Sequence, residues 1–190
     1  IIKSINSKMV QKLIRSGLSN KDLIRPFGWD SKPREKNLLW LDKNENVDRI
    51  YNDFISELAL KIDKESITCY PEPANLYKKL SILEGVSKES LILTPGSDGA
   101  ISNTFNVFIN LKDKVLVTRP SFAMYEIYCR IFNADTYFIN YARDLVSPSL
   151  SIDNLLSTLQ KVKPKLFCLP NPDSPTGAII NSDDIDKIIK

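Results

Sequence analysis

Residues 165–177 read KLFCLPNPDSPTG, a short apolar run followed by a loop of rigid and small polar residues. The apolar run predicts a buried strand over 165–169. In the loop, proline fixes φ and Gly177 allows a positive φ, so the backbone is held in one conformation. Open α/β sheets bind ligands with polar groups on turns at the carboxyl ends of their strands. From these residues alone, a ligand-binding loop and a plain strand-to-helix connection are equally good interpretations.

The segments around this loop alternate between strand and helix patterns. Strands are expected at 91–94, 114–118, 135–140 and 165–169. Helices are expected at 8–16, 48–62, 74–84, 97–110, 122–132 and 152–162 and from Ser182 onward, and extended chain at 38–41. Strands that alternate with helices predict an α/β fold, in which helices sandwich a mostly parallel sheet.

The composition excludes several classes of function. The chain is 43% hydrophobic and 26% charged, and its net charge of +3 comes without a long basic run, which argues against a nucleic-acid partner. It has no histidine, which excludes a Ser-His-Asp triad, a Cys-His pair and a His-ligated metal site within these residues. No signal peptide or long apolar span is apparent, so we expect a cytoplasmic protein with no membrane partner.

The three cysteines lie far apart in the sequence, at Cys69, Cys129 and Cys168. Their odd number and wide spacing predict neither a disulfide scaffold nor a zinc site, and no metal ligands are assigned. Cys129 and Cys168 fall in apolar patterns, so we expect them to pack as small hydrophobic residues.

Five motifs follow one another along the chain. They are LDKNEN at 41–46, YPEP at 70–73, TPGSDG at 94–99, RPSFAMY at 119–125 and NPDSPTG at 171–177. Together, over roughly residues 39–190, they resemble the pyridoxal-phosphate aminotransferases of fold type I, and within them the histidinol-phosphate aminotransferase branch. The resemblance implies pyridoxal 5'-phosphate as cofactor, a small-molecule amino donor, a keto or aldehyde acceptor, and a homodimer.

The same resemblance implies a division into domains. Residues 1–65 would form an N-terminal arm and part of the small domain. Residues 66–190 would form the N-terminal part of the cofactor-binding large domain, which is incomplete in this chain. We therefore expect a partial large domain of the fold type I architecture.

The TPGSDG motif predicts an anion site at the start of a helix. Gly96 permits a tight turn, Ser97 or Asp98 can cap the helix, and the N–H groups of the first turn attract an anion. Ordinary capping is the alternative interpretation. The resemblance assigns the cofactor phosphate to Gly96, Ser97 and Asp98. Asp98 is expected to contribute its backbone N–H, because its carboxylate repels phosphate.

The next two loops are implied to contact the cofactor ring. Phe122 can stack on a flat heteroaromatic ring, although it could also be one more core residue. Ser174 stands where the family usually has an asparagine that donates to the cofactor's phenolic oxygen, and a hydroxyl is a shorter donor. Asn171 is included among the cofactor-binding residues and is expected to brace its loop. Arg119 is interpreted as structural rather than as a phosphate ligand.

Two further motifs supply the remaining site predictions. The resemblance implies that Tyr70 reaches across a dimer interface to the partner's cofactor phosphate, although a plain hydrophobic residue at a turn is the alternative. It also implies that Asn44 and Asn46 lie near the substrate. Without the resemblance, these two asparagines would be interpreted as loop or capping residues.

No catalytic residue is assigned within this chain. In the family, the Schiff-base lysine and the acid that pairs with the pyridinium nitrogen follow the NPDSPTG loop, so neither is expected in residues 1–190. We expect the N-terminal half of a longer enzyme, inactive by itself, that transaminates an amino acid or an amino-alcohol phosphate. The alternatives are a pyridoxal-phosphate-dependent amino acid decarboxylase, and a catalytically inactive domain for phosphate-ligand binding or dimerisation.

Overall fold

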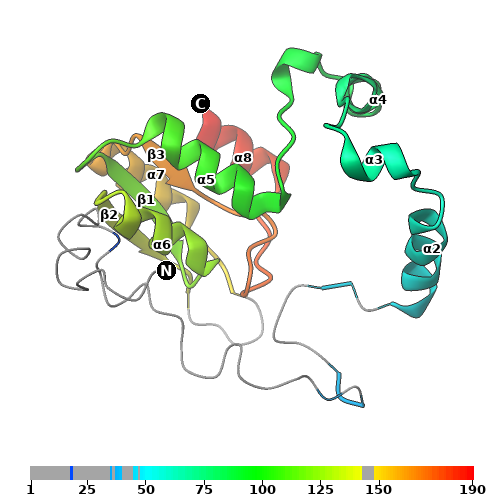
Figure 1. Ribbon diagram of the computed structural model, residues 1–190. Helices are drawn as coiled ribbons and strands as arrows, with labels where there is room; N and C mark the ends of the chain where they lie inside the picture. The colour runs from blue at the N-terminus through cyan, green and yellow to red at the C-terminus, as the bar shows by residue number, and fades with distance from the viewer. Residues whose placement is uncertain (1–17, 19–34, 36, 40–44, 47, 143–147) are drawn as a thin grey trace, which may run out of the picture. The chain divides into compact units, whose positions relative to one another are not determined.

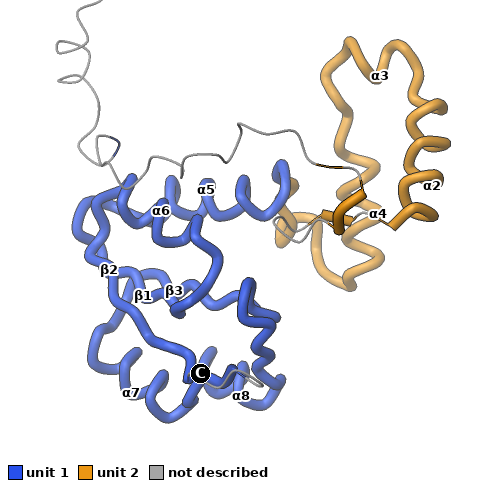
Figure 2. The backbone as a smooth tube through the Cα atoms, turned by 90° about the horizontal axis from the view of Figure 1, so that it is seen from below, with its two compact units in different colours: residues 1–26, 94–190 blue, residues 27–93 orange. Residues whose placement is uncertain are grey.

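The computed structural model describes residues 18, 35, 37–39, 45–46, 48–142 and 148–190. They fall into two compact units, one within 27–93 and one that comprises 94–190 together with 1–26 (Figure 2). The expected helix at 8–16 lies outside the described residues, and so does half of the expected extended run at 38–41. Leu38 and Leu39 of that run are exposed and form no strand.

The unit that contains 94–190 is built on a parallel sheet with the strand order β2-β1-β3 (Figure 1). The strands are β1 (Lys114–Arg119), β2 (Asp135–Asn140) and β3 (Leu166–Cys168). Because β1 lies in the middle and is covered on both faces, its residues 115–118 are all at most 1% exposed. The parallel sheet and three of its four predicted strands are confirmed.

Helices cover both faces of this sheet. The helices are α5 (Gly96–Phe108), α6 (Ala123–Ile131), α7 (Ile152–Val162) and α8 (Ser182–Ile189). Figure 2 shows α5 and α6 on one side of the strands, and α7 and α8 on the other. The strand order explains this division. The crossover from β1 to β2 through α6 and the crossover from β2 to β3 through α7 run in opposite directions across the sheet, so right-handed connections place the two helices on opposite faces.

Each face of the sheet has its own hydrophobic core. On the α5–α6 side, Val115 and Val117 pack with Phe105 and with the two buried cysteines, Cys129 and Cys168. On the α7–α8 side the buried residues are Leu116, Ile139 and Leu155. The prediction that Cys129 and Cys168 pack as small hydrophobic residues is confirmed. Burial raises the pKa of the Cys129 thiol to about 11 and that of Cys168 to about 12.

The unit within 27–93 consists of helices. They are α2 (Arg49–Ala59), α3 (Lys64–Thr68), α4 (Ala74–Glu84) and the 3-10 turn η3 (Lys88–Ser90). Asp48 caps α2 by accepting from the N–H of Ile50 at 2.7 Å, and α4 ends at Gly85 with φ +66°. The predictions of α2 and α4 are confirmed, whereas α3 and η3 were not expected. None of the described residues of this unit is buried.

The strand predicted at 91–94 is wrong. The backbone is extended at Leu91 (φ −112°, ψ 142°), but no ladder forms there. The N–H of Leu93 donates instead to the hydroxyl of Tyr77, at 3.1 Å. An extended segment counts as a strand only when a neighbouring segment accepts its hydrogen bonds.

Two features are absent from the residues that the structure describes. None of their helices has both the length and the apolar character that a bilayer-crossing segment needs. No group of three or more metal-ligating side chains gathers among them either.

Candidate functional site

Three loops of the unit with 94–190 meet at the carboxyl edge of its sheet. Parallel strands end at the same edge, so the segments after β1 and β3 emerge together, and the start of α5 lies at that edge too (Figure 1). A pocket of about 280 Å³ lies nearby between α5 and β3, lined by Ala100 of α5, Tyr125 of α6 and Leu169 after β3, among others. This is the edge at which an open α/β sheet binds its ligand.

The start of α5 is a tight turn without a side-chain cap. Gly96 has φ +71°, its N–H donates to the carbonyl of Thr94 at 2.8 Å, and the Thr94 hydroxyl donates to the carbonyl of Gly96 at 2.8 Å. The N-cap residue is Pro95, so the prediction that Ser97 or Asp98 caps this helix is wrong. Both stand inside the first turn, two and three residues past the capping position.

The backbone packs closely at this turn. A Cβ atom on Gly99 would lie 2.8 Å from Cδ of Pro95, which is closer than real contacts allow. Gly96, Ser97 and Asp98 are all exposed. The first turn of α5 therefore presents its N–H groups and the positive end of the helix dipole to solvent, with no side chain capping it.

Phe122 stands at the N-cap of α6, three residues after the last residue of β1. The residue is 36% exposed, and its ring is nearly perpendicular to that of Tyr125, with 6.0 Å between the centroids and 88° between the planes. It belongs to neither hydrophobic core, in contrast to the core interpretation. An aromatic ring is thus partly exposed at the carboxyl edge.

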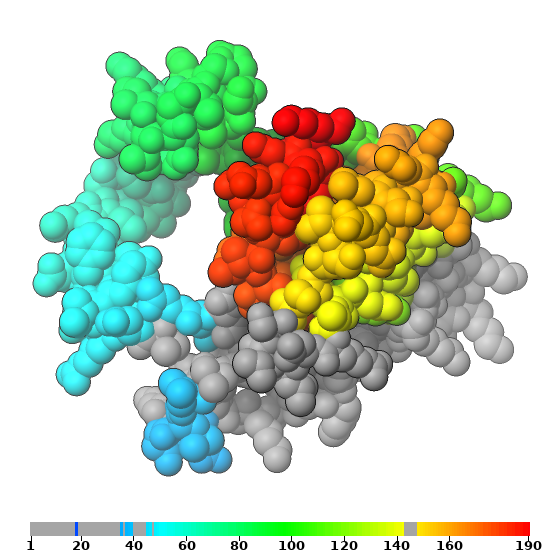
Figure 3. Space-filling view, turned by 180° about the vertical axis from the view of Figure 1, so that it is seen from behind, coloured from blue at the N-terminus to red at the C-terminus, as the bar shows by residue number. Residues whose placement is uncertain are grey.

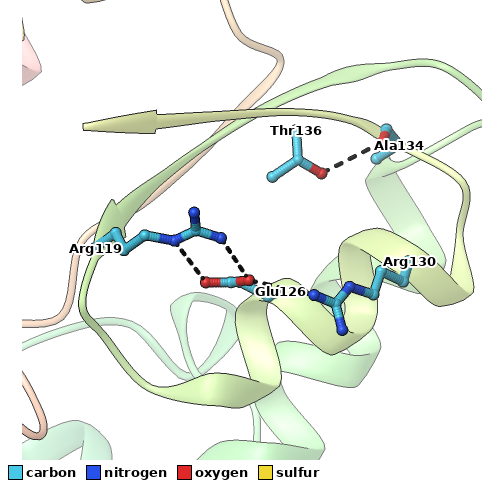
Figure 4. Close-up of polar contacts among 5 residues, drawn as sticks. All are labelled: Arg119, Glu126, Arg130, Ala134 and Thr136. Atoms are coloured by element: carbon cyan, nitrogen blue, oxygen red, sulfur yellow. Dashed lines mark hydrogen bonds and ion pairs between the residues drawn. The ribbon is translucent and has the colours of Figure 1, made fainter. Parts of the chain in front are cut away.

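Arg119 fixes the start of α6 to the end of β1 (Figure 4). Its Nε and Nη2 donate to the two carboxylate oxygens of Glu126, at 3.1 and 2.8 Å, and Arg130 lies 3.6 Å from the same carboxylate. The Arg119 guanidinium also lies 3.6 Å from the ring centroid of Phe138. These contacts agree with the interpretation of Arg119 as structural.

The loop after β3 is closed at its base by Asn171. The side-chain amide of Asn171 donates to the carbonyl of Ile180 at 2.9 Å, and its Oδ1 accepts from the N–H of Ile180 at 2.9 Å. The prediction that Asn171 braces this loop is confirmed, and its role toward a cofactor stays a prediction. Ser174 lies in the exposed part of the loop.

Asp173 joins this loop to the loop after β1. The hydroxyl of Ser121 donates to Oδ1 at 2.6 Å, and the hydroxyl of Thr176 donates to Oδ2 at 2.6 Å. The backbone of Asp173 also donates to the carbonyl of Ala178 at 2.9 Å and accepts from the N–H of Gly177 at 2.8 Å. Although it is a carboxylate, the residue is only 3% exposed.

Sequence reasoning missed Asp173, because a lone aspartate in a polar turn is most often a solvated residue. Its charge reaches two tyrosines that pack nearby. Burial raises the pKa of Tyr141, and the charge of Asp173 adds to the increase. For Tyr125, burial is again the main cause of the raised pKa, followed by Cys168 and then Asp173.

The other predicted site residues lie in the unit within 27–93 or outside the described chain. Tyr70 is 97% exposed. Asn46 accepts through Oδ1 from the N–H of Asp48 at 3.0 Å, so it braces the approach to α2. Asn44 lies outside the described residues. The structure therefore gathers Gly96, Ser97, Asp98, Phe122, Asn171 and Ser174 in one unit.

A second hollow lies on the α7–α8 side of the sheet. It has a volume of about 400 Å³ and is lined by parts of the segments 148–152 and 176–184 and by Tyr141. Figure 3 shows these two segments, yellow and orange to red, side by side on one face. The loop after β3 thus borders both the carboxyl edge and this hollow.

Sequence comparison relates the chain to known proteins. Residues 36–190 match the family model of aminotransferase class I and II. The chain is 27% identical over 184 residues to a histidinol-phosphate aminotransferase of Clostridium novyi, covering 96% of this chain and 49% of that protein. It is 31% identical over 178 residues to the corresponding protein of Methanocaldococcus jannaschii, covering 91% and 45%. The chain spans about half the length of the curated relatives it matches.

Solved structures share the fold. A histidinol-phosphate aminotransferase of Sinorhizobium meliloti, solved in complex with pyridoxal-5'-phosphate, matches with a TM-score of 0.62 and 18% identity over 70% of this chain and 36% of that one. An alpha-aminoadipate aminotransferase of Thermus thermophilus matches with a TM-score of 0.60 and 21% identity, over 73% and 36%. At these identities the likeness concerns the fold alone.

Proposed function

The chain belongs to the class I and II aminotransferase family, and from this premise we propose that it builds one side of a pyridoxal 5'-phosphate site in an amino-group-transferring enzyme. One observation carries the proposal. Asp173 bonds Ser121 at 2.6 Å and Thr176 at 2.6 Å, and so holds the Phe122 loop against the Ser174 loop. Both loops lie at the carboxyl edge with the uncapped start of α5.

The chemistry of these groups fits the cofactor. A phosphate needs backbone donors and positive potential, which the first turn of α5 offers at Gly96, Ser97 and Asp98. A pyridine ring needs an aromatic face, and Phe122 is 36% exposed. A phenolic oxygen needs a donor, and the hydroxyl of Ser174 is exposed.

Each group then has a defined task in the proposed site. The first-turn N–H groups of α5 bind and orient the phosphate, and the carboxylate of Asp98 points away from it. Phe122 covers one face of the ring and keeps water off it. The hydroxyl of Ser174 donates a hydrogen bond to the phenolic oxygen, while Asn171 holds the loop in shape. When bound, the cofactor supplies the electron sink for chemistry at the substrate's α-carbon.

The remaining parts of the proposal concern the whole protein. We propose that its substrates are a small amino donor and a keto or aldehyde acceptor, with histidinol phosphate as the best single candidate. The names of the most similar relatives support this choice. We further propose that residues 1–65 form an N-terminal arm and part of the small domain, and that residues 66–190 form the N-terminal part of the large domain. The lysine that attaches the cofactor is proposed to lie outside residues 1–190.

A homodimer is part of the same proposal. Tyr70 would reach the partner's cofactor phosphate, and Asn44 and Asn46 would lie near the substrate. The 97% exposure of Tyr70 supports the first of these roles, because its side chain is not consumed by packing within its own unit.

Binding of the cofactor by this chain tests the proposal. We expect saturable binding of pyridoxal 5'-phosphate, followed by the dichroism of the bound chromophore, and much weaker binding of pyridoxal, which lacks the phosphate. Phe122→Ala and Ser174→Ala should each weaken binding by about tenfold, the cost of one good contact. Reduction with borohydride should leave no covalent adduct. Equal binding of the two compounds, or no effect of either substitution, would contradict the proposal.

Turnover is tested with the longest protein that carries this chain. We expect it to transfer the amino group of histidinol phosphate to 2-oxoglutarate, with glutamate as the measured product. Release of carbon dioxide from a phosphorylated amino acid, without glutamate formation, would show the decarboxylase alternative to be the right one.

A further inference from the structure

Asp173 is the one charged residue of the described chain that is buried. The residue is 3% exposed, and it has no cationic partner among the ion pairs of the described residues. Burying a charge in this way is costly unless hydrogen bonds compensate it. The two hydroxyl donors at 2.6 Å have the short length typical of charge-assisted bonds.

The two donors come from segments that are distant in sequence. Ser121 lies 52 residues before Asp173 and immediately precedes Phe122, whereas Thr176 lies three residues after it in the loop of Ser174. A carboxylate has two oxygens that only accept, so both hydroxyls can point at it at once. One side chain thereby fixes the spacing between the two loops.

From this geometry we propose that Asp173 is a positioning residue, which sets the distance between Phe122 and Ser174 and so lets the ring-stacking residue and the phenolic-oxygen donor contact the same cofactor ring. The inference rests on the proposed function for the identity of the ligand. The coupling of the two loops through Asp173 belongs to the chain itself and can be measured without any ligand.

The first experiment therefore uses the ligand-free chain. Hydrogen–deuterium exchange is measured by mass spectrometry in peptides covering 119–123 and 171–178, in the parent and in Asp173→Ala. We expect exchange to accelerate in both loops together, by about tenfold or more, while the centre of β1 keeps its protection. Ser121→Ala removes only one donor, from a half-buried position, and should still accelerate exchange in 171–178.

Asp113 provides a matched control at the opposite edge of the sheet. Its carboxylate also joins distant segments, because it accepts from Lys165 Nζ at 2.6 Å and from the N–H of Asn110 at 2.8 Å. Asp113→Asn should leave exchange in both loops at the parental rate. The inference is overturned if Asp173→Ala leaves exchange in 119–123 at the parental rate. It is also overturned if Ser121→Ala leaves exchange in 171–178 at the parental rate.

The second experiment adds pyridoxal 5'-phosphate at a temperature where all variants are folded. Asp173→Ala should weaken binding by about tenfold or more and reduce the dichroism of the bound cofactor, because Phe122 and Ser174 are no longer held at a fixed distance from each other. Asp173→Asn should stay within about threefold of the parent, since its amide can bond both hydroxyls. A purely structural role would lower the melting temperature and leave both binding readouts unchanged, and this result would also overturn the inference.

The two proposals fail in different ways. If the parent chain does not bind pyridoxal 5'-phosphate, the proposed function fails, while the exchange data still decide whether Asp173 couples the loops. If the parent binds and Asp173→Ala binds equally well, the positioning role fails and the proposed function stands.

Discussion

Helices α2 and α7 illustrate the difference between the two units. Each has 11 residues and a polar N-cap, Asp48 in α2 and Ser151 in α7. Yet α7 buries Leu155 and Val162 against the sheet, whereas none of the residues of α2 is buried. Local sequence signals thus specify a helix equally well in both units, and only contacts with distant segments decide whether its apolar face is buried.

The largest expected difference is in the cost of truncating a leucine. Leu155 is 0% exposed and Leu58 of α2 is 41% exposed. Leu155→Ala should lower the free energy of unfolding by about 2–5 kcal/mol, because it leaves a cavity in the core. Leu58→Ala should cost less than about 1 kcal/mol. Urea denaturation of both variants measures the free energy of unfolding. Both variants replace leucine by alanine within a helix, so they differ only in the surroundings of the side chain. Equal losses of free energy would contradict the distinction between the units.

The cysteines give the next largest contrast. Cys69 is exposed, whereas Cys129 and Cys168 are buried with raised pKa values of about 11 and about 12. At pH 8 we expect a thiolate-specific reagent to label Cys69 at least about a hundredfold faster than the other two, because two pKa units reduce the thiolate fraction a hundredfold. Peptide mapping after timed labelling checks this, with urea-unfolded protein as the control in which all three react.

The same shifts predict how stability depends on pH. The folded pKa values lie above the ordinary value of 9.0, so the contribution of the two buried thiols is complete below pH 9. It is lost as the pH rises from 9 toward 11 and 12. Unfolding midpoints that stay constant over this range would contradict the burial of these cysteines.

The smallest effect concerns the helix ends. Helix α4 ends at Gly85 with φ +66°, whereas α7 ends at Lys163 with φ +51°, a conformation that costs energy for a residue with a Cβ. Lys163→Gly should raise the free energy of unfolding by about 0.5–1 kcal/mol. Gly85→Ala should accelerate amide exchange only within α4. A global loss of stability in Gly85→Ala would show that the two units unfold together.

The sequence was sufficient for those parts of the fold that local patterns encode. The helices α4 and α7 lie at the predicted ranges 74–84 and 152–162, and β1 lies at the predicted strand 114–118 with one further residue. The segment 91–94 was wrongly predicted because a strand depends on a neighbour, which the composition of one segment does not reveal. The exposure of the apolar face of α2 was hidden for the same reason.

The candidate site was predictable in its backbone and less so in its polar contacts. The tight turn at Gly96 and the brace at Asn171 follow from residues that lie close together in the sequence. The bonds of Asp173 do not, because its partner Ser121 lies 52 residues away and nothing in a single sequence pairs the two. The missing cap of α5 was also not evident, because Pro95 rather than Ser97 occupies the capping position.

The closure of the loop after β3 by Asn171 and Ile180 limits how its length can change. Surface loops usually tolerate inserted or deleted residues, because their ends stay in place while the tip adapts. Here the base is held by two hydrogen bonds and the middle by Asp173, so one extra residue between them would carry Asp173 away from Ser121. Substitutions can therefore accumulate at its exposed positions, whereas a change in the number of its residues would break the link between the two loops.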